Sequence, residues 1–301
     1  MKRVAIKTVD AFTTVPFGGG PAGVVTDASS LTTDEMQTIA REMSISETVF
    51  VAPPTDPKAD FHVRFFSPSD EIPLVGHATI AAFFTLASEG RIKLTGDETT
   101  VHQQTGAGVL PVTIFSKNGQ VERVVMTQNL PVIEDIDVTR EEVAEALGLT
   151  PADLGDTPLQ RSSTGLFWMM VPIRTLKASQ SISPDLAKIT AISKRCGVVG
   201  MATFTKETVN PEATIHTRVF GPAIGIPEDP ACGTGNGAIS GYMFKHGLVS
   251  KGPKVSIRAE QALEMKRPSD IHVELDTDGE QVTGVRVGGK AVTVLTGEII
   301  F

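Results

Sequence analysis

The residues of this 301-residue chain best suited to chemistry lie in the stretch from 228 to 239, EDPACGTGNGAI. It carries two carboxylates, a thiol, a hydroxyl and three glycines at every second position, and an apolar segment follows it. A glycine-rich turn that begins a helix presents unpaired backbone N–H groups and the positive end of the helix dipole. Such a turn can bind a carboxylate or a phosphate. We therefore interpret this stretch as one wall of an active site.

A second stretch repeats this arrangement about half a chain earlier. Residues 64–73 and 218–227 share Arg, Phe, Pro, Ile and Pro at the same relative positions, and a glycine turn and an apolar segment follow both. A three-residue insertion in the second copy aligns the turns. The aligned pairs are Gly76 with Gly233, His77 with Thr234, and Val75 with Cys232. The pattern indicates an internal duplication.

Three ionisable residues are candidates for proton transfer. Glu47 precedes the apolar run 49–51, where burial would raise its pKa and suit it to general acid–base work. His77 lies at a helix start, where the dipole would keep the imidazole neutral. Asp229 opens the glycine-rich turn. The more ordinary roles are a solvated strand end, a structural histidine and an acid that hydrogen-bonds its own turn.

The thiol of Cys232 opens a different chemistry, because a cysteine at a helix N-terminus can become nucleophilic. An epimerase with two opposed thiols would need a partner cysteine, but the aligned position is Val75 and Cys196 belongs to another helix. A single-thiol epimerase or dehydratase stays open. The glycine spacing differs from that of a dinucleotide-binding turn, and a proline-containing loop precedes it, so a nucleotide is disfavoured.

Composition excludes several classes of partner. The net charge of −8 argues against nucleic acid and anionic membranes. Two cysteines give neither a disulfide framework nor a set of zinc ligands. The N-terminal residues lead directly into an apolar strand and no apolar run is long enough for a membrane span, so we expect a cytoplasmic protein.

Strands and helices alternate along the chain in two similar series, so the expected fold is α+β with two halves, each a sheet wrapped around one apolar helix. Residues 1–127 form the expected N-terminal half and 128–290 the C-terminal half. Residues 291–301 are predicted as a strand pair that can complete the first sheet. The two central helices are predicted at residues 76–88 and 235–245. Other predicted helices start near Thr32 or lie at 139–147 and 184–196, and an Asn-Gly hairpin joins strands 109–115 and 121–127.

Several motifs together resemble the phenazine-biosynthesis-like (PhzF) family. They are Asp10-Ala-Phe-Thr with residues 16–22, Ser46-Glu-Thr, Gly76-His-Ala-Thr, Glu228-Asp-Pro-x-x-Gly-Thr, and the segments 261–269 and 287–292. The resemblance runs nearly end to end. It implies the fold of diaminopimelate epimerases and proline racemases, in which two pseudo-symmetric halves with mixed or antiparallel sheets flank an active-site cleft.

The resemblance also implies roles for individual residues. Glu47 matches the catalytic acid/base, and His77 and Asp229 match further catalytic residues. Thr234 matches another site residue, and Gly76 and Gly233 match the amides that hold the substrate carboxylate. Ser46 and Cys232 are added as predicted substrate-binding residues. The family's characterised reaction moves a proton between carbons of a dihydro-hydroxyanthranilate without metal or organic cofactor. The chain departs from the usual pattern at Gly20, Cys232, Thr234 and Ala262, and its substrate does not follow from the resemblance.

We therefore expect a cofactor-independent isomerase that acts by general acid–base catalysis on a small carboxylate-bearing molecule. Neither nucleic acid nor a membrane is an expected partner, and a homodimer stays open. The alternatives are a single-thiol epimerase or dehydratase that uses Cys232, and a small-ligand binding protein that has lost its chemistry. The most informative single observation would be ligand-dependent incorporation of solvent deuterium across a panel of amino and hydroxy acids.

Overall fold

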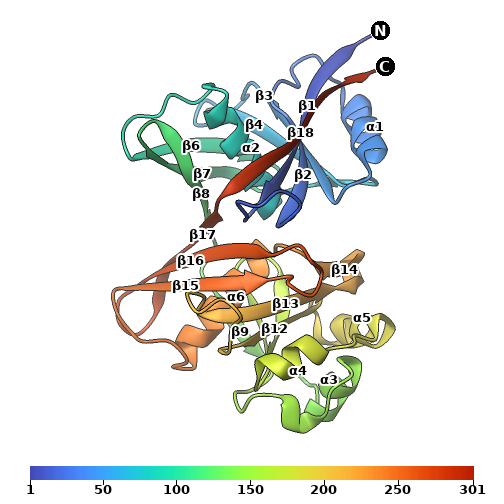
Figure 1. Cartoon of the computed structure of the whole chain (residues 1–301), viewed down its shortest axis with the longest axis vertical. Coiled ribbons are helices and arrows are strands. Elements are labelled where there is room, and N and C mark those ends of the chain that lie inside the picture. The colour runs from blue at the N-terminus through green and yellow to red at the C-terminus, as the bar shows by residue number, and fades with distance from the viewer. The chain divides into compact units, whose positions relative to one another are not determined.

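The computed structural model describes residues 1–301, which form two compact units. Unit 1 contains Met1–Thr127 and Gly288–Phe301, and unit 2 contains Gln128–Val287. Each unit combines a mixed sheet with a few helices, so the predicted α+β class is confirmed (Figure 1). None of the helices has both the length and the apolar character needed to cross a membrane.

Unit 1 is built on a sheet whose strands run in the order β18–β1–β2–β3–β4–β6–β7–β8. The β2–β3 and β4–β6 pairs are parallel and the others antiparallel. The strands are β1 (Arg3–Ala11), β2 (Gly20–Val25), β3 (Glu47–Ala52), β4 (Phe61–Phe66), β5 (Glu71–Ile72), β6 (Glu98–Thr105), β7 (Gly108–Lys117), β8 (Gln120–Gln128) and β18 (Ala291–Ile300). The helices are α1 (Thr33–Met43) and the central α2 (Gly76–Ser88).

Unit 2 repeats this plan in the order β9–β10–β11–β12–β13–β15–β16. Here β11–β12 and β13–β15 are the parallel pairs. The strands are β9 (Val132–Asp135), β10 (Gln160–Ser163), β11 (Phe167–Pro172), β12 (Met201–Thr205), β13 (Ile215–Gly221), β14 (Ile226–Asp229), β15 (Lys254–Gln261), β16 (Ser269–Thr277) and β17 (Val282–Gly289). The helices are α3 (Arg140–Ala146), α4 (Leu176–Ser181), α5 (Leu186–Cys196) and α6 (Gly233–Lys245), with 3-10 turns η1 (Pro151–Asp153) and η2 (Pro222–Ile224).

The internal duplication is confirmed by matching strand order and by matching side-chain contacts. The series β1–β2–β3–β4–β6–β7 has the same directions as β10–β11–β12–β13–β15–β16, and α2 follows β5 as α6 follows β14. Arg64 makes two hydrogen bonds to Glu71 and lies 5.1 Å from the ring centre of Phe66. Arg218 makes two hydrogen bonds to Glu228 and lies 5.1 Å from the ring centre of Phe220.

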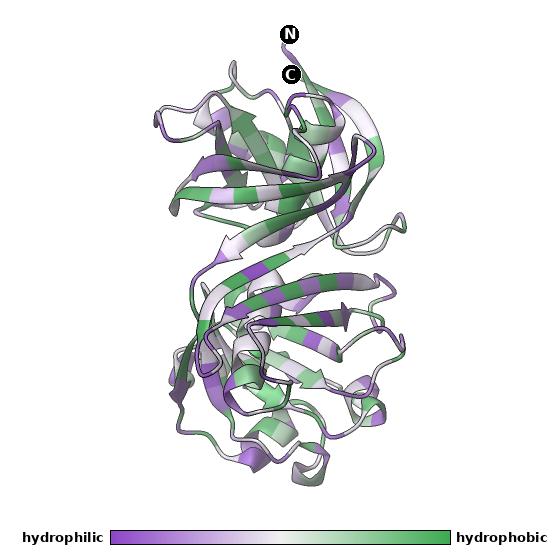
Figure 2. Ribbon diagram, turned by 90° about the vertical axis from the view of Figure 1, so that its left-hand side faces the viewer, coloured by the Kyte–Doolittle hydropathy of each residue, from purple (hydrophilic) through white to green (hydrophobic).

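Local sequence signals account for several element boundaries. Thr32 and Glu35 form the expected capping box at the start of α1. Asn118 and Gly119 take φ angles of 53° and 74° at the turn between β7 and β8, as the hairpin requires. Buried and more accessible positions alternate along β16, and Figure 2 shows hydrophilic and hydrophobic positions alternating along strands of the molecule.

The C-terminal tail differs from the prediction. It forms the single strand β18 rather than a strand pair, because its hydrogen-bonding partner is β1 at the other end of the sequence. The register runs from Arg3 opposite Ile300 to Ala11 opposite Ala291. Local sequence patterns in the tail do not indicate a pairing partner so distant in the chain.

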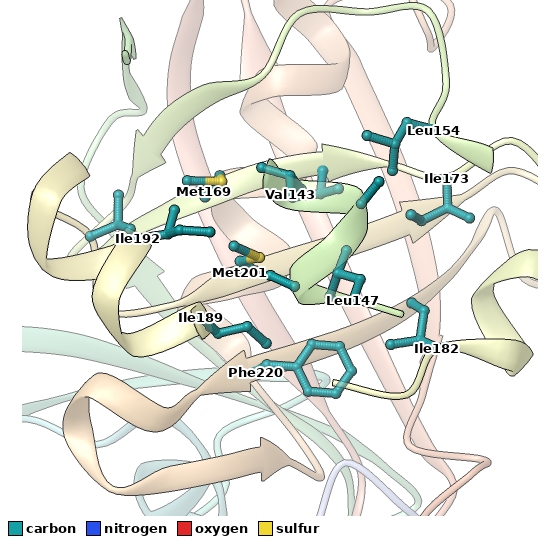
Figure 3. Packing of buried hydrophobic residues seen from close by; sticks show 14 of the residues in the cluster. Val143, Leu147, Leu154, Met169, Ile173, Ile182, Ile189, Ile192, Met201 and Phe220 are labelled. Atoms are coloured by element: carbon teal, nitrogen blue, oxygen red, sulfur yellow. The ribbon is translucent and has the colours of Figure 1, made fainter. Parts of the chain in front are cut away.

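The central helices are the main buried elements, and unit 2 has a further apolar cluster. Residues on most sides of α2 and nearly all residues of α6 are buried, which agrees with the predicted central helices. Figure 3 shows the further cluster, in which side chains of α3 and α5 meet residues of β11, β12 and β13. Its largest members include Leu147, Met169, Ile189, Met201 and Phe220. The two buried central helices begin at Gly76 and Gly233, which are candidate site residues.

Candidate functional site

In unit 1 the structure brings together three of the predicted residues, Ser46, Glu47 and His77. Glu47 is the first residue of β3 and is 7% exposed, and His77 is the second residue of α2. Nε2 of His77 lies 3.0 Å from Oε2 of Glu47. The Ser46 hydroxyl donates a hydrogen bond to the carbonyl of Pro21 and lies 3.4 Å from the same imidazole nitrogen. A buried carboxylate, an imidazole and a hydroxyl therefore share one small region.

The pKa of Glu47 differs from the sequence-based prediction. Burial tends to raise this pKa, but the charge of His77, whose Nε2 lies 3.0 Å from the carboxylate, outweighs it. The pKa of Glu47 is therefore lowered, and the prediction of a raised value was wrong. Sequence patterns can indicate that a residue is buried, but they do not show which charged group lies beside it in the fold. At neutral pH the Glu47 side chain is a carboxylate that can accept a proton.

The start of α2 has no side-chain cap. Its N-cap residue is Val75, which offers no hydrogen-bond acceptor to the first N–H groups of the helix. At Gly76, an added Cβ would meet only Sδ of Met126, at the ordinary contact distance of 3.7 Å. Packing therefore does not require glycine at this position, and the small residue leaves the backbone of the turn approachable.

In unit 2 the turn between β14 and α6 carries Asp229, Cys232, Gly233 and Thr234. Oδ1 of Asp229 accepts a hydrogen bond from the N–H of Ala231 at 2.8 Å, so this acid does stabilise its own turn. The Cys232 sulfur caps α6 by accepting the N–H of Gly235. The turn thus places a carboxylate, a thiol and a hydroxyl at the start of the second central helix.

Two buried amide side chains hold this turn, and sequence reasoning missed both. The Gln261 amide donates to the carbonyl of Asp229 at 2.6 Å, and the Asn236 amide donates to the carbonyl of Cys232 at 2.9 Å. The two amides are joined by a 2.7 Å hydrogen bond, and both side chains are fully buried. A buried polar pair that is fully hydrogen-bonded restricts the backbone it contacts. A polar residue amid the apolar run of α6 was the only signal for Asn236.

The thiol of Cys232 is unsuited to be a nucleophile. It is 4% exposed, and burial together with the carboxylate of Asp229 raises its pKa well above the usual value. Hydrogen bonds from Gly235 and Thr234 lower the pKa but do not offset these effects. The thiol therefore stays protonated at neutral pH and serves as the helix cap, whereas a thiol epimerase needs a thiolate.

Gly233, Gly235 and Gly237 are glycines for different structural reasons. A Cβ at Gly235 would lie 3.0 Å from Sγ of Cys232, and a Cβ at Gly237 would collide with the side-chain oxygen of Gln128. Packing therefore explains Gly235 and Gly237. The anion-binding interpretation of this turn thus concerns Gly233, the first residue of α6.

The duplicated scaffold provides the Glu47 carboxylate in unit 1 alone. Thr48 lies opposite Phe66 in the β3–β4 pair, and Met201 lies opposite Phe220 in the β12–β13 pair. Because Phe66 and Phe220 are equivalent in the repeat, Thr48 is equivalent to Met201. The position equivalent to Glu47 is therefore Gly200. A Cβ at Gly200 would collide with the carbonyl oxygen of Phe220, so even alanine does not fit there without rearrangement. Proton-transfer candidates are thus distributed unequally between the two units.

Comparisons with known proteins agree with this architecture. The pattern of the family described as phenazine biosynthesis-like protein matches residues 9–297. A curated protein of Clostridium acetobutylicum, named an uncharacterised isomerase, is 34% identical over 100% of this chain and 99% of its own length. A Bacillus anthracis structure titled as a phenazine biosynthesis protein of the PhzF family is 29% identical, with a TM-score of 0.90 and 100% coverage of both chains.

A more distant structure shows the fold alone. It is a hydroxyproline epimerase from Agrobacterium vitis, 15% identical, with a TM-score of 0.66, covering 99% of this chain and 91% of that chain. Together with the family match, it confirms the predicted fold.

Proposed function

Because the chain belongs to the phenazine biosynthesis-like protein family and is an isomerase like its curated relatives, we propose that it moves a proton between carbon atoms of a small carboxylate-bearing substrate. General acid–base catalysis performs the transfer, and no metal or organic cofactor takes part. The observation that carries this proposal is the buried Glu47 carboxylate beside His77.

Glu47 is the acid and base of the proposed reaction. Its carboxylate takes a proton from one carbon, and the electron pair of the broken C–H bond passes into the adjoining π system of the substrate. The protonated Glu47 then returns a proton to another carbon of that system. Burial favours the protonated form of Glu47 and the charge of His77 favours the ionised form, so the environment supports both states that the cycle needs.

A single carboxyl group favours a transfer in which the proton leaves and returns on the same face of the substrate. An epimerase that inverts a carbon uses one group to remove the proton and a second group to add one on the opposite face. The second unit has Gly200 where Glu47 stands in the first, and its Cys232 thiol is buried with a raised pKa. These features favour an isomerase that relocates a proton over an enzyme that inverts a centre.

The remaining predicted residues bind and orient the substrate in this proposal. Backbone N–H groups at Gly76, with the dipole of α2, and backbone N–H groups at Gly233, with the dipole of α6, each offer a place for carboxylate oxygens of the substrate. The hydroxyl of Thr234 donates a further hydrogen bond, Ser46 lies beside the imidazole of His77, and Asp229 binds a substrate donor without exchanging protons with carbon. The substrate is the only partner that the proposal requires, with neither nucleic acid nor membrane involved.

The test is solvent deuterium incorporation into small carboxylates in D₂O, followed by NMR. The panel contains amino acids, hydroxy acids and cyclic unsaturated acids, each with its matching amide. We expect exchange at a C–H bond of at least one acid, with none for its amide, and loss of exchange in Glu47→Gln. Exchange that survives Glu47→Gln and disappears in Cys232→Ser would transfer the role to the thiol and overturn the proposal.

A further inference from the structure

We propose that Trp168 is a positioning residue that orients the Thr234 hydroxyl so that it donates its hydrogen to the substrate carboxylate. The inference deepens the proposed function and rests on it, because it assumes that an anion binds at the start of α6. It concerns two residues of unit 2, one on β11 and one in the first turn of the helix.

The contact between these residues is well defined. Nε1 of Trp168 lies 3.2 Å from Oγ1 of Thr234. The indole is 1% exposed, and Gly221 lies close enough that an added Cβ would stand 3.1 Å from the ring. The carbonyl of Thr234 also lies 3.3 Å from the hydroxyl of Thr164. The surrounding residues thus leave the Trp168 ring little room to move, whereas Thr234 is partly exposed to solvent.

Hydrogen-bond chemistry fixes the direction of this contact. An indole N–H is a donor only, whereas a hydroxyl carries one hydrogen and two lone pairs. Oγ1 of Thr234 must therefore accept from Trp168, and its own hydrogen points to another atom. A neighbour within reach is the sulfur of Cys232, at 3.7 Å, which is a weak acceptor. A carboxylate oxygen is a much better acceptor, so a bound anion gains a donor that is already oriented.

The duplication indicates that Trp168 is not required by the scaffold. Gly23 lies opposite Thr48 in the β2–β3 pair, and Met169 lies opposite Met201 in the β11–β12 pair. Because Thr48 and Met201 are equivalent, Gly23 is equivalent to Met169. The position equivalent to Trp168 is therefore Ala22, and unit 1 forms the same sheet with this small residue. The indole occurs in the unit whose helix starts with a threonine hydroxyl, whereas unit 1 has His77 at the equivalent position. A role in orienting that hydroxyl accounts for the difference.

The chain contains one tryptophan, so replacing tryptophan throughout the protein changes Trp168 alone. In β-(3-benzothienyl)alanine a sulfur atom replaces the indole N–H and the bicyclic shape is kept. We would titrate benzoate and benzamide by calorimetry into both proteins, and into both again with Thr234→Val. Thermal unfolding of each protein would report its stability.

We expect the benzothienyl protein to bind benzoate about three- to tenfold more weakly, since the hydroxyl is no longer held as a donor to a charged group. Benzamide binding should change less. In the Thr234→Val background the same replacement should have no further effect, because the two residues act as one unit. Thr234→Ser, which keeps the hydroxyl, should retain the dependence on the indole N–H.

Three results would overturn the inference. They are equal benzoate affinity in the tryptophan and benzothienyl proteins, an equal loss in the Thr234→Val background, or equal weakening for benzamide. Failure of the proposed proton transfer has a different signature, namely normal benzoate binding with deuterium exchange that does not depend on Glu47. If the unmodified protein binds no benzoate at all, both the anion site and the role of Trp168 are wrong.

Discussion

Nε2 of His77 lies 3.0 Å from Oε2 of Glu47, and the two side chains are only 12% and 9% exposed. Water therefore screens this pair poorly, and the ionisation of one group depends on the charge of the other. One partner comes from the start of β3 and the other from the start of α2. The fold thus joins a general acid–base candidate to the helix start proposed to bind the substrate.

Glu47→Gln should lower the rate of solvent deuterium exchange by about 10²–10⁴-fold, the usual cost of losing a general acid or base. Substrate affinity should change little, because the amide keeps the size of the side chain. The measurement is exchange by NMR at matched saturation. Glu42→Gln, an exposed change in the same unit, serves as the control and should leave the rate unaltered. Equal rates in the Glu47→Gln variant and the unchanged protein would remove Glu47 from the mechanism.

His77→Gln should raise the pKa of Glu47. The substitution removes the charge that lowers this pKa and leaves burial, which raises it. Titration of the ¹³C-labelled side-chain carboxyl of Glu47 by NMR would give the value directly. We expect it to move from below the ordinary 4.5 to above it. A pKa that stays low in His77→Gln would show that another group holds the carboxylate ionised.

The lowered pKa of Glu47 also makes the stability of the fold depend on pH. Because the folded-state pKa lies below the unfolded value near 4.5, the ionised carboxylate stabilises the folded state fully above that pH. This contribution is lost as the pH falls through the folded-state pKa. The difference in unfolding free energy between the unchanged protein and Glu47→Gln should therefore shrink below about pH 4.5, as measured by urea denaturation. A constant difference from about pH 7 to about pH 3 would contradict the assigned direction.

Sequence patterns were informative where the determinants are local. The helix at residues 76–88 was predicted with the bounds that α2 has, because its apolar residues and glycine start are contiguous. The capping box at Thr32 and the turn at Asn118 are likewise determined by a few adjacent residues. The repeat of Arg, Phe, Pro, Ile and Pro predicted the relation between β4 and β13 because both copies keep the same packing of arginine on phenylalanine.

What the sequence did not reveal depends on contacts between distant segments. The low pKa of Glu47 requires His77, which the fold brings from another element. The pairing of β18 with β1 joins the two ends of the chain. The hydrogen bond from Trp168 to Thr234 links a strand and a helix start that are far apart in sequence. Such contacts depend on the packing of the whole unit, so local sequence patterns do not predict them.

Cys232→Ser should keep most of the exchange activity, because the serine hydroxyl can also accept the N–H of Gly235 and cap α6. The buried thiol with its raised pKa should also react slowly with iodoacetamide near neutral pH, which mass spectrometry would follow. Cys196 is also buried with a raised pKa and provides the internal comparison. Rapid alkylation of Cys232 that abolishes exchange would favour thiol chemistry.

Replacement of the two equivalent arginines should affect stability to different extents. The Arg218 side chain is 6% exposed and binds Glu228, whose side chain is 16% exposed, and two backbone carbonyls, so Arg218→Gln leaves a poorly solvated carboxylate and two carbonyls without their donor. We expect a loss of about 3–5 kcal/mol in unfolding free energy. The Arg64 side chain is 20% exposed and Glu71 is 43% exposed, so Arg64→Gln should cost about 1 kcal/mol or less. Denaturant unfolding of both variants would measure the contrast, and equal losses would contradict it.

The glycine turns at Gly76 and Gly233 should each be able to bind carboxylate oxygens through the backbone. Neither turn contains lysine or arginine, so backbone N–H groups and helix dipoles must supply the positive potential, roughly half a charge at each helix start. Calorimetry should find benzoate bound at least about tenfold more tightly than benzamide, since hydrogen bonds to a charged acceptor contribute about 1.5–3 kcal/mol each. Gly76→Val and Gly233→Val should each weaken benzoate binding at the turn that they change, because the valine side chain blocks approach to the backbone there. Gly297→Val is the control, because its Cβ would meet only Leu295 at 3.8 Å. Equal affinity for acid and amide, or normal binding by a folded Gly233→Val protein, would show that the turns only start their helices.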